Sequence, residues 1–101
     1  MMKTPKFNYD SKDSSPTITF MKNNPVVFWE HFLNAAEYIL NNPKIDSWPA
    51  VIFESKESIK NYTVEITRED IPVMLEKGLN KLEELEEYML CKKIMDLKAR
   101  L

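Results

Sequence analysis

The chain has 101 residues, a net charge of −2 and a charged fraction of 30%, which is the composition of one globular domain. The small net charge predicts no general attraction to nucleic acid or to anionic membranes, and a single cysteine excludes an internal disulfide. One glycine is too few for the phosphate-binding loops of nucleotide-binding motifs, which need several glycines so that the backbone can approach the ligand.

Residues 1–15 are polar and contain no apolar run, so they do not resemble a secretory signal. No stretch of the chain reaches the ~20 apolar residues that a membrane-spanning helix needs. We therefore expect a cytoplasmic protein with no membrane partner, no metal and no cofactor. Residues 1–15 are interpreted as a flexible arm, with Phe7 and Tyr9 as its anchors, followed by a single domain over residues 16–101.

Residues 17–21 alternate along the chain and include β-branched side chains, a pattern that predicts a short strand. A helix then begins after Asn24, which can cap it, with Pro25 in its first turn, and it ends before Asn42-Pro43. Side chains spaced three and four residues apart form the core-facing stripe of this helix: Phe28, Trp29, Phe32, Leu33, Ala36, Ile39 and Leu40.

His31 is the only histidine, and it lies outside this stripe on the polar flank of the helix, near Val27 and Tyr38. It has no second histidine or nearby cysteine as a metal co-ligand and no positioned partner for catalysis. We therefore interpret His31 as a solvated or locally hydrogen-bonded side chain. Val27, His31 and Tyr38 together remain a candidate patch for a ligand or a partner.

Two further segments predict a β-hairpin. Residues 50–54 are typical of a buried strand that begins at Pro49, and residues 62–67 alternate apolar and polar side chains like a half-buried strand. The polar connection between them is too short for a parallel crossover, so the two strands are expected to be antiparallel.

The last element is predicted to be one helix from about residue 70 to residue 100, with no breaker after its first turn. Its start is either a capping box from Thr67 to Asp70 or, as we prefer, Asp70 itself as the cap, with Pro72 in the first turn. Such a helix is about 45 Å long and would project past the core of so small a domain. Gly78 marks either a close helix approach or a tolerated defect costing about 1 kcal/mol. A heptad stripe is expected to face the first helix and the sheet: Ile71, Leu75, Gly78, Leu82, Leu85 and Met89.

The final third of this helix is apolar on nearly every face, which predicts that a partner covers part of it. An acidic block (Glu83, Glu84, Glu86, Glu87) precedes a basic block (Lys92, Lys93, Lys98, Arg100), so two antiparallel copies would pair opposite charges. The same order of charges also suits the helix dipole of a monomer. The expected interface of a homodimer consists of Tyr88, Leu90, Cys91, Ile94, Met95, Leu97 and Leu101.

These patterns predict an α+β fold in the order β-α-β-β-α. No catalytic constellation is recognised. Cys91 has two interpretations: a reactive thiolate favoured by neighbouring lysines, or a small apolar residue in a helix contact. The leading functional hypothesis is a small intracellular protein-interaction protein, a dimeric regulator or inhibitor of the kind that phages encode, which binds another protein. The alternative is a small-ligand or nucleotide-binding protein with a pocket at the dimer junction, and nucleic acid is not an expected partner because the lysines are dispersed.

Overall fold

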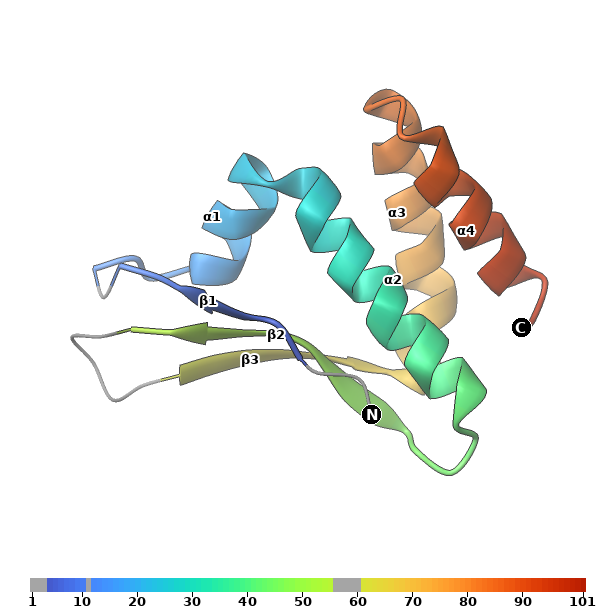
Figure 1. The fold of residues 1–101 in the computed structure, drawn as a ribbon, viewed down its shortest axis with the longest axis horizontal. Coiled ribbons are helices and arrows are strands. Elements are labelled where there is room, and N and C mark those ends of the chain that lie inside the picture. The colour runs from blue at the N-terminus through green and yellow to red at the C-terminus, as the bar shows by residue number, and fades with distance from the viewer. Residues whose placement is uncertain (1–3, 11, 56–60) are drawn as a thin grey trace.

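A three-stranded sheet and four helices form two layers in the computed structural model, which describes residues 4–10, 12–55 and 61–101 (Figure 1). The helices lie on one side of the sheet (Figure 1). This arrangement confirms the predicted α+β class. In chain order the elements are β1 (Lys6–Asn8), α1 (Pro16–Asn23), α2 (Pro25–Asn41), β2 (Ser47–Glu54), β3 (Asn61–Thr67), a 3-10 turn (Arg68–Asp70), α3 (Ile71–Glu84) and α4 (Tyr88–Lys98).

The sheet has the strand order β1-β2-β3, with β1 parallel to β2 and β2 antiparallel to β3. The predicted hairpin is therefore confirmed, although β2 begins at Ser47, before the expected start at Pro49. A register shift between Pro49 and Val51 lets the strand accept a proline that cannot donate a ladder hydrogen bond. The turn predicted between the strands spans residues 55–58, and all of it except Ser55 lies outside the described residues.

Part of the segment predicted as an arm forms an edge of the sheet. Phe7 in β1 is opposite Phe53 in β2, and its ring lies 4.5 Å from the ring of Phe20 by centroid distance. Tyr9 contacts the ring of Tyr62 at a centroid distance of 5.4 Å. The expectation that Phe7 and Tyr9 anchor this segment is confirmed by these contacts.

The strand predicted over residues 17–21 is wrong, because these residues belong to helix α1. Pro16 occupies the first turn, where its fixed φ suits a helix and its missing N–H breaks no hydrogen bond. The helix turns Phe20 toward Phe7 and Phe53, with ring centroids 4.5 and 5.6 Å apart, and leaves Ile18 exposed. The alternating pattern of residues 17–21 therefore does not mark a strand. The strand that pairs with β2 at this edge of the sheet is β1.

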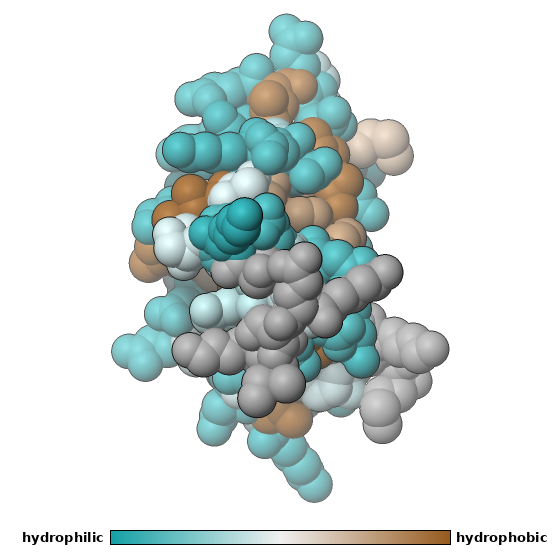
Figure 2. Space-filling model, turned by 90° about the vertical axis from the view of Figure 1, so that its left-hand side faces the viewer, coloured by the Kyte–Doolittle hydropathy of each residue, from teal (hydrophilic) through white to brown (hydrophobic). Residues whose placement is uncertain are grey.

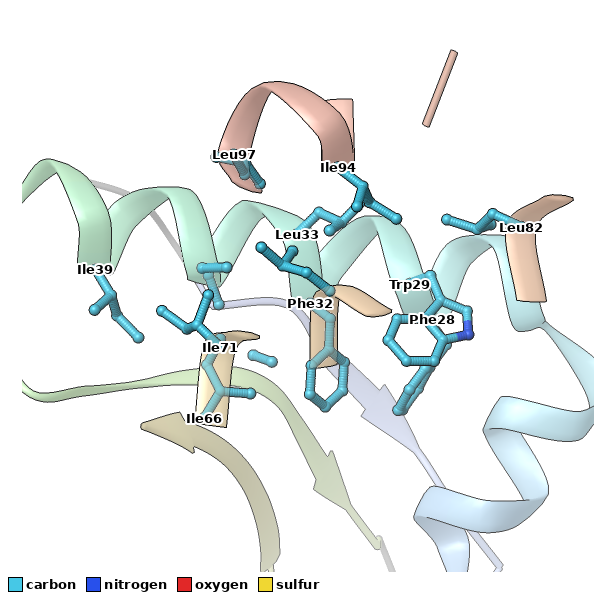
Figure 3. Close-up of a cluster of buried hydrophobic side chains, with 14 of the residues drawn as sticks. Phe28, Trp29, Phe32, Leu33, Ile39, Ile66, Ile71, Leu82, Ile94 and Leu97 are labelled. Atoms are coloured by element: carbon cyan, nitrogen blue, oxygen red, sulfur yellow. The ribbon is translucent and has the colours of Figure 1, made fainter. Parts of the chain in front are cut away.

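Helix α2 has the predicted bounds and supplies the centre of the core. Its aromatic stripe lies between the sheet and the last two helices (Figure 3). The labelled side chains in this cluster come from α2, β3, α3 and α4: Phe28, Trp29, Phe32, Leu33, Ile39, Ile66, Ile71, Leu82, Ile94 and Leu97.

The C-terminal end of α2 is held by a residue from beyond β3. The last turn of α2 contains no basic residue. Instead, Nη2 of Arg68 donates to the carbonyl oxygens of Ile39, Asn42 and Ile45, at 2.8, 2.9 and 2.6 Å. A positive charge at this end also opposes the helix dipole, so Arg68 fastens α2 to the end of the hairpin.

Candidate interaction surface

The single closing helix predicted from the sequence is wrong, because the chain reverses direction between Leu85 and Glu87 (Figure 1). Glu86 takes a left-handed conformation with φ of 58°. The N–H of Glu87 donates to the carbonyl of Leu82 at 2.9 Å, and the N–H of Glu86 donates to the carbonyl of Glu83 at 3.1 Å. These two bonds form a Schellman motif, which ends α3 and sends α4 back along it.

Helix α4 packs on both α3 and α2, and Gly78 of α3 lies close to Trp29 of α2 and Ile94 of α4. A Cβ added to Gly78 would lie 3.0 Å from Cε3 of Trp29 and 3.4 Å from Cδ1 of Ile94. Of the two interpretations of Gly78, close helix approach is therefore the correct one. The first four residues of the predicted heptad stripe are buried, and the last two are exposed: Leu85 at the end of α3 and Met89 beyond the break.

The reversal places much of the predicted dimer interface inside the chain's own core. Cys91, Ile94 and Leu97 are buried against α2 and α3, and Leu90 packs at the edge of the same cluster. Cys91, Ile94 and Leu97 are therefore largely covered by their own chain, because the turn folds the second stripe back onto α2, whereas Leu90 is only partly buried. The exposed members of the predicted interface are Tyr88, Met95 and Leu101.

The basic block of α4 is also used within the chain. Nζ of Lys93 donates to Oδ1 of Asn34 at 2.7 Å, and Nη2 of Arg100 donates to Oδ1 of Asn41 at 2.6 Å. Lys98 forms an ion pair with Glu76 of α3. Within one chain, these three basic residues therefore already have partners on α2 and α3.

The outward side of α4 carries large apolar side chains that the chain does not cover. Tyr88, Met89 and Met95 are 66%, 88% and 53% exposed. Tyr88, Lys92 and Met95 share one face by their spacing of four and three residues, and Met89 lies beside them. We call Tyr88, Met89, Lys92 and Met95 the outer surface of α4, and Glu83, Glu84, Glu86 and Glu87 the acidic turn that adjoins it.

Two of the three residues of the proposed patch on α2, His31 and Tyr38, contact aromatic rings of the sheet. His31 is half-buried, and its ring lies 5.6 Å from the ring of Phe7 by centroid distance. Tyr38 stacks against Trp48 of β2 with a centroid distance of 4.1 Å, while Val27 is exposed. The ring contact of His31 crosses to β1, so His31 is a packing residue as well as a polar one.

Burial lowers the pKa of His31, and the neighbouring carboxylate of Glu30 opposes this effect. Because the folded state holds the proton less tightly than the unfolded state, His31 contributes stability at neutral pH that is lost as pH falls below its ordinary pKa of 6.5. We expect wild type to lose more stability than His31→Phe, which keeps a ring against Phe7, between about pH 7.5 and about pH 5. Urea midpoints of both proteins at the two pH values measure the difference, and parallel losses would contradict it.

Cys91 does not have the environment of a reactive thiol. Burial raises the pKa of Cys91, and the carboxylates of Glu83 and Glu87 raise it further. The thiol form is therefore favoured at neutral pH, which supports the interpretation of Cys91 as a small apolar residue in a helix contact.

A groove that the sequence did not indicate lies between the α1–α2 corner and α3. Its volume is about 380 Å³, and it is lined by Met21, Lys22, Pro25, Trp29 and Lys81. The end of the molecule nearest α1 shows separate apolar patches among hydrophilic side chains over the helical layer (Figure 2). Sequence reasoning missed this groove because it assigned α1 as a strand, which removed the corner that forms one wall.

In the part of the chain that the structure describes, no three His, Cys, Asp or Glu side chains are grouped so that they could hold a metal ion. None of the helices in the same residues has the length and apolar character that crossing a membrane requires. Comparisons with protein-family models, curated proteins and solved structures find no match to this chain.

Proposed function

We propose that this protein acts in the cytoplasm by binding another protein, as a regulator or inhibitor, through the outer surface of α4. The observation that supports this proposal is the exposure of Tyr88, Met89 and Met95, at 66%, 88% and 53%, on one short helix. Aromatic and methionine side chains are enriched at the centres of protein interfaces, and contiguous exposed apolar surface on a small domain marks such sites.

The acidic turn indicates the chemistry of the partner. Glu83, Glu84 and Glu86 are exposed beside the apolar side chains of α4, and Glu87 is half-buried. The partner is therefore expected to offer an apolar cleft bordered by lysine or arginine side chains. Such charges steer association, so the association rate is expected to fall as ionic strength rises.

The test compares two altered surfaces on the same fold. Tyr88→Glu combined with Met95→Glu places two charges on the outer surface of α4, whereas Val73→Glu places one on the exposed side of α3, where Val73 is 59% exposed. We expect the double variant to lose the partner at least a hundredfold in affinity, because two interface anchors are replaced by charges. Val73→Glu is expected to bind like wild type.

The measurement is affinity capture from cells that express the chain, followed by titration of the captured protein against all three purified proteins. Circular dichroism confirms that each variant is folded. A protein that binds wild type and Val73→Glu but not the double variant supports the proposal. Equal binding by all three, or capture of only the chain itself, would overturn it.

The second candidate function, ligand binding, rests on the groove beside α1 and not on a dimer junction. Lys22 and Lys81 border this groove, and the buried indole of Trp29 forms part of its wall. Thermal denaturation in the presence of a panel of nucleotides and metabolites, with Trp29 fluorescence as a second readout, separates the two functions. A rise in melting temperature that Lys22→Ala and Lys81→Ala abolish would favour ligand binding.

A further inference from the structure

The turn between α3 and α4 has the hydrogen bonds of a Schellman motif but lacks the glycine that usually occupies its left-handed position. Glu86 stands there with φ of 58°. A residue with a Cβ pays a conformational penalty in this region, which glycine avoids. The turn is therefore the strained point of the helical hairpin.

The sequence across the turn favours a continuous helix instead. Residues 81–87 read Lys-Leu-Glu-Glu-Leu-Glu-Glu, all strong helix formers. In a straight helix, Leu85 and Met89 would continue the line of Gly78 and Leu82, whereas in the hairpin they are 36% and 88% exposed. Local preference thus opposes the turn, which is maintained by the packing of α4.

We infer that two copies of this chain exchange their α4 helices. In the exchanged dimer, α3 and α4 join into one helix, and each α4 occupies on the other copy the place that it occupies on its own chain in the monomer. A second copy of this chain is the expected partner, because the surface of α2 and α3 against which α4 packs is already complementary to this helix. This inference is independent of the proposed function, since it uses the buried side of α4.

The direction of packing permits this exchange. Because α4 runs antiparallel to α3, two straight helices would lie antiparallel, related by a two-fold axis near Glu86 (Figure 1). The ion pair between Lys98 and Glu76 and the contact between Ile94 and Gly78 would each form twice, now between chains. The exchange keeps the packing of α4 and removes two strained turns.

Charge opposes the exchange at low salt. The acidic turns of both copies would meet near the two-fold axis, and like charges repel. We therefore expect the dimer dissociation constant of the purified chain to fall several-fold between about 0.05 M and about 0.5 M salt, as screening increases.

Two substitutions at one position test the inference with matched loss of charge. Glu86→Gly relieves the left-handed turn and weakens a continuous helix, whereas Glu86→Ala keeps the strain and strengthens the helix. Converting one turn into helix differs between the two variants by about thirtyfold, and the dimer requires two such conversions, one in each chain, so the dimer dissociation constants should differ about a thousandfold. Sedimentation equilibrium measures both constants, and equal values for the two variants would overturn the inference.

A cross-link distinguishes exchange from any other dimer. Unlabelled and ¹⁵N-labelled Glu86→Ala chains are unfolded, mixed, refolded and treated with a carbodiimide, which joins the Glu76 carboxylate to the Lys98 amine as an amide. Exchange gives linked peptides with one light and one heavy member in the dimer fraction. Linked peptides of one isotope only, or a monomer at about 100 µM, would overturn the inference.

Two controls complete this experiment. Lys98→Gln removes the linked peptide and confirms its identity. Tyr88→Ser with Met95→Ser is expected to leave exchange unchanged, because these side chains lie on the outer surface of α4 and the substitutions add no charge near the acidic turn. Loss of the dimer in that double variant would show face-to-face association through the outer surface and would contradict the exchange.

Discussion

Replacing Ile94 with alanine is expected to lower the free energy of unfolding by about 3–4 kcal/mol, as for other large buried aliphatic residues. Ile94 has no exposed surface, and it lies where Gly78 lets α4 approach α3 and Trp29. Gly78 has no side chain that could fill the resulting cavity. The loss therefore combines transfer of the removed methyl groups with a cavity that closes poorly.

The matched control is the next residue along the same helix. Met95 is 53% exposed, so Met95→Ala should change the free energy of unfolding by less than about 0.5 kcal/mol. Urea titrations followed by tryptophan fluorescence, at a protein concentration where the chain is monomeric, measure both values. Equal losses for the two variants would mean that α4 does not pack on its own chain. That outcome would agree with the prediction from the sequence, in which a partner covers this helix.

Replacing Arg68 with alanine is expected to lower the free energy of unfolding by about 3 kcal/mol. Arg68 donates to three carbonyl oxygens around the end of α2, and bonds from charged donors are worth about 1.5–3 kcal/mol. Its removal leaves the carbonyls of Ile39, Asn42 and Ile45 without this donor and removes the charge that opposes the helix dipole.

Two variants separate this role from general charge effects. Arg100→Ala removes a cation that makes one exposed side-chain bond to Asn41, and it should cost less than about 1 kcal/mol. Arg68→Lys keeps the charge but loses the planar guanidinium, so it should recover only part of the loss. Denaturant titration of the three proteins measures these differences. A loss for Arg68→Ala no larger than that for Arg100→Ala would show that the cap contributes little.

Elements with strong periodic patterns and clear ends were predictable. Helix α2 combines a proline in its first turn, an apolar stripe and a proline just beyond its end, and the structure has the predicted bounds. The hairpin and the first part of α3 also follow their patterns. In these segments local preference and the needs of the core agree, so short-range reasoning suffices.

Elements chosen by distant contacts were not predictable. The alternation in residues 17–21 favours a strand, but these residues form helix α1, from which Phe20 contacts Phe7 and Phe53. Likewise, nothing near Arg68 in the sequence shows that it caps a helix that ended many residues earlier. Each contact joins residues far apart in the chain, and a pattern within one segment carries no record of them.

For the candidate site, the sequence alone determined that the end of the chain carries more apolar surface than one helix face can hold, since this follows from residue spacing. Only the tertiary structure decided which part of that surface is covered. The reversal at Glu86 buries Ile94 and Leu97 and leaves Tyr88, Met89 and Met95 outside. The physical reason is that packing of α4 against α2 outweighs the helical preference of residues 85–87, and packing energy depends on partners that the local sequence does not specify.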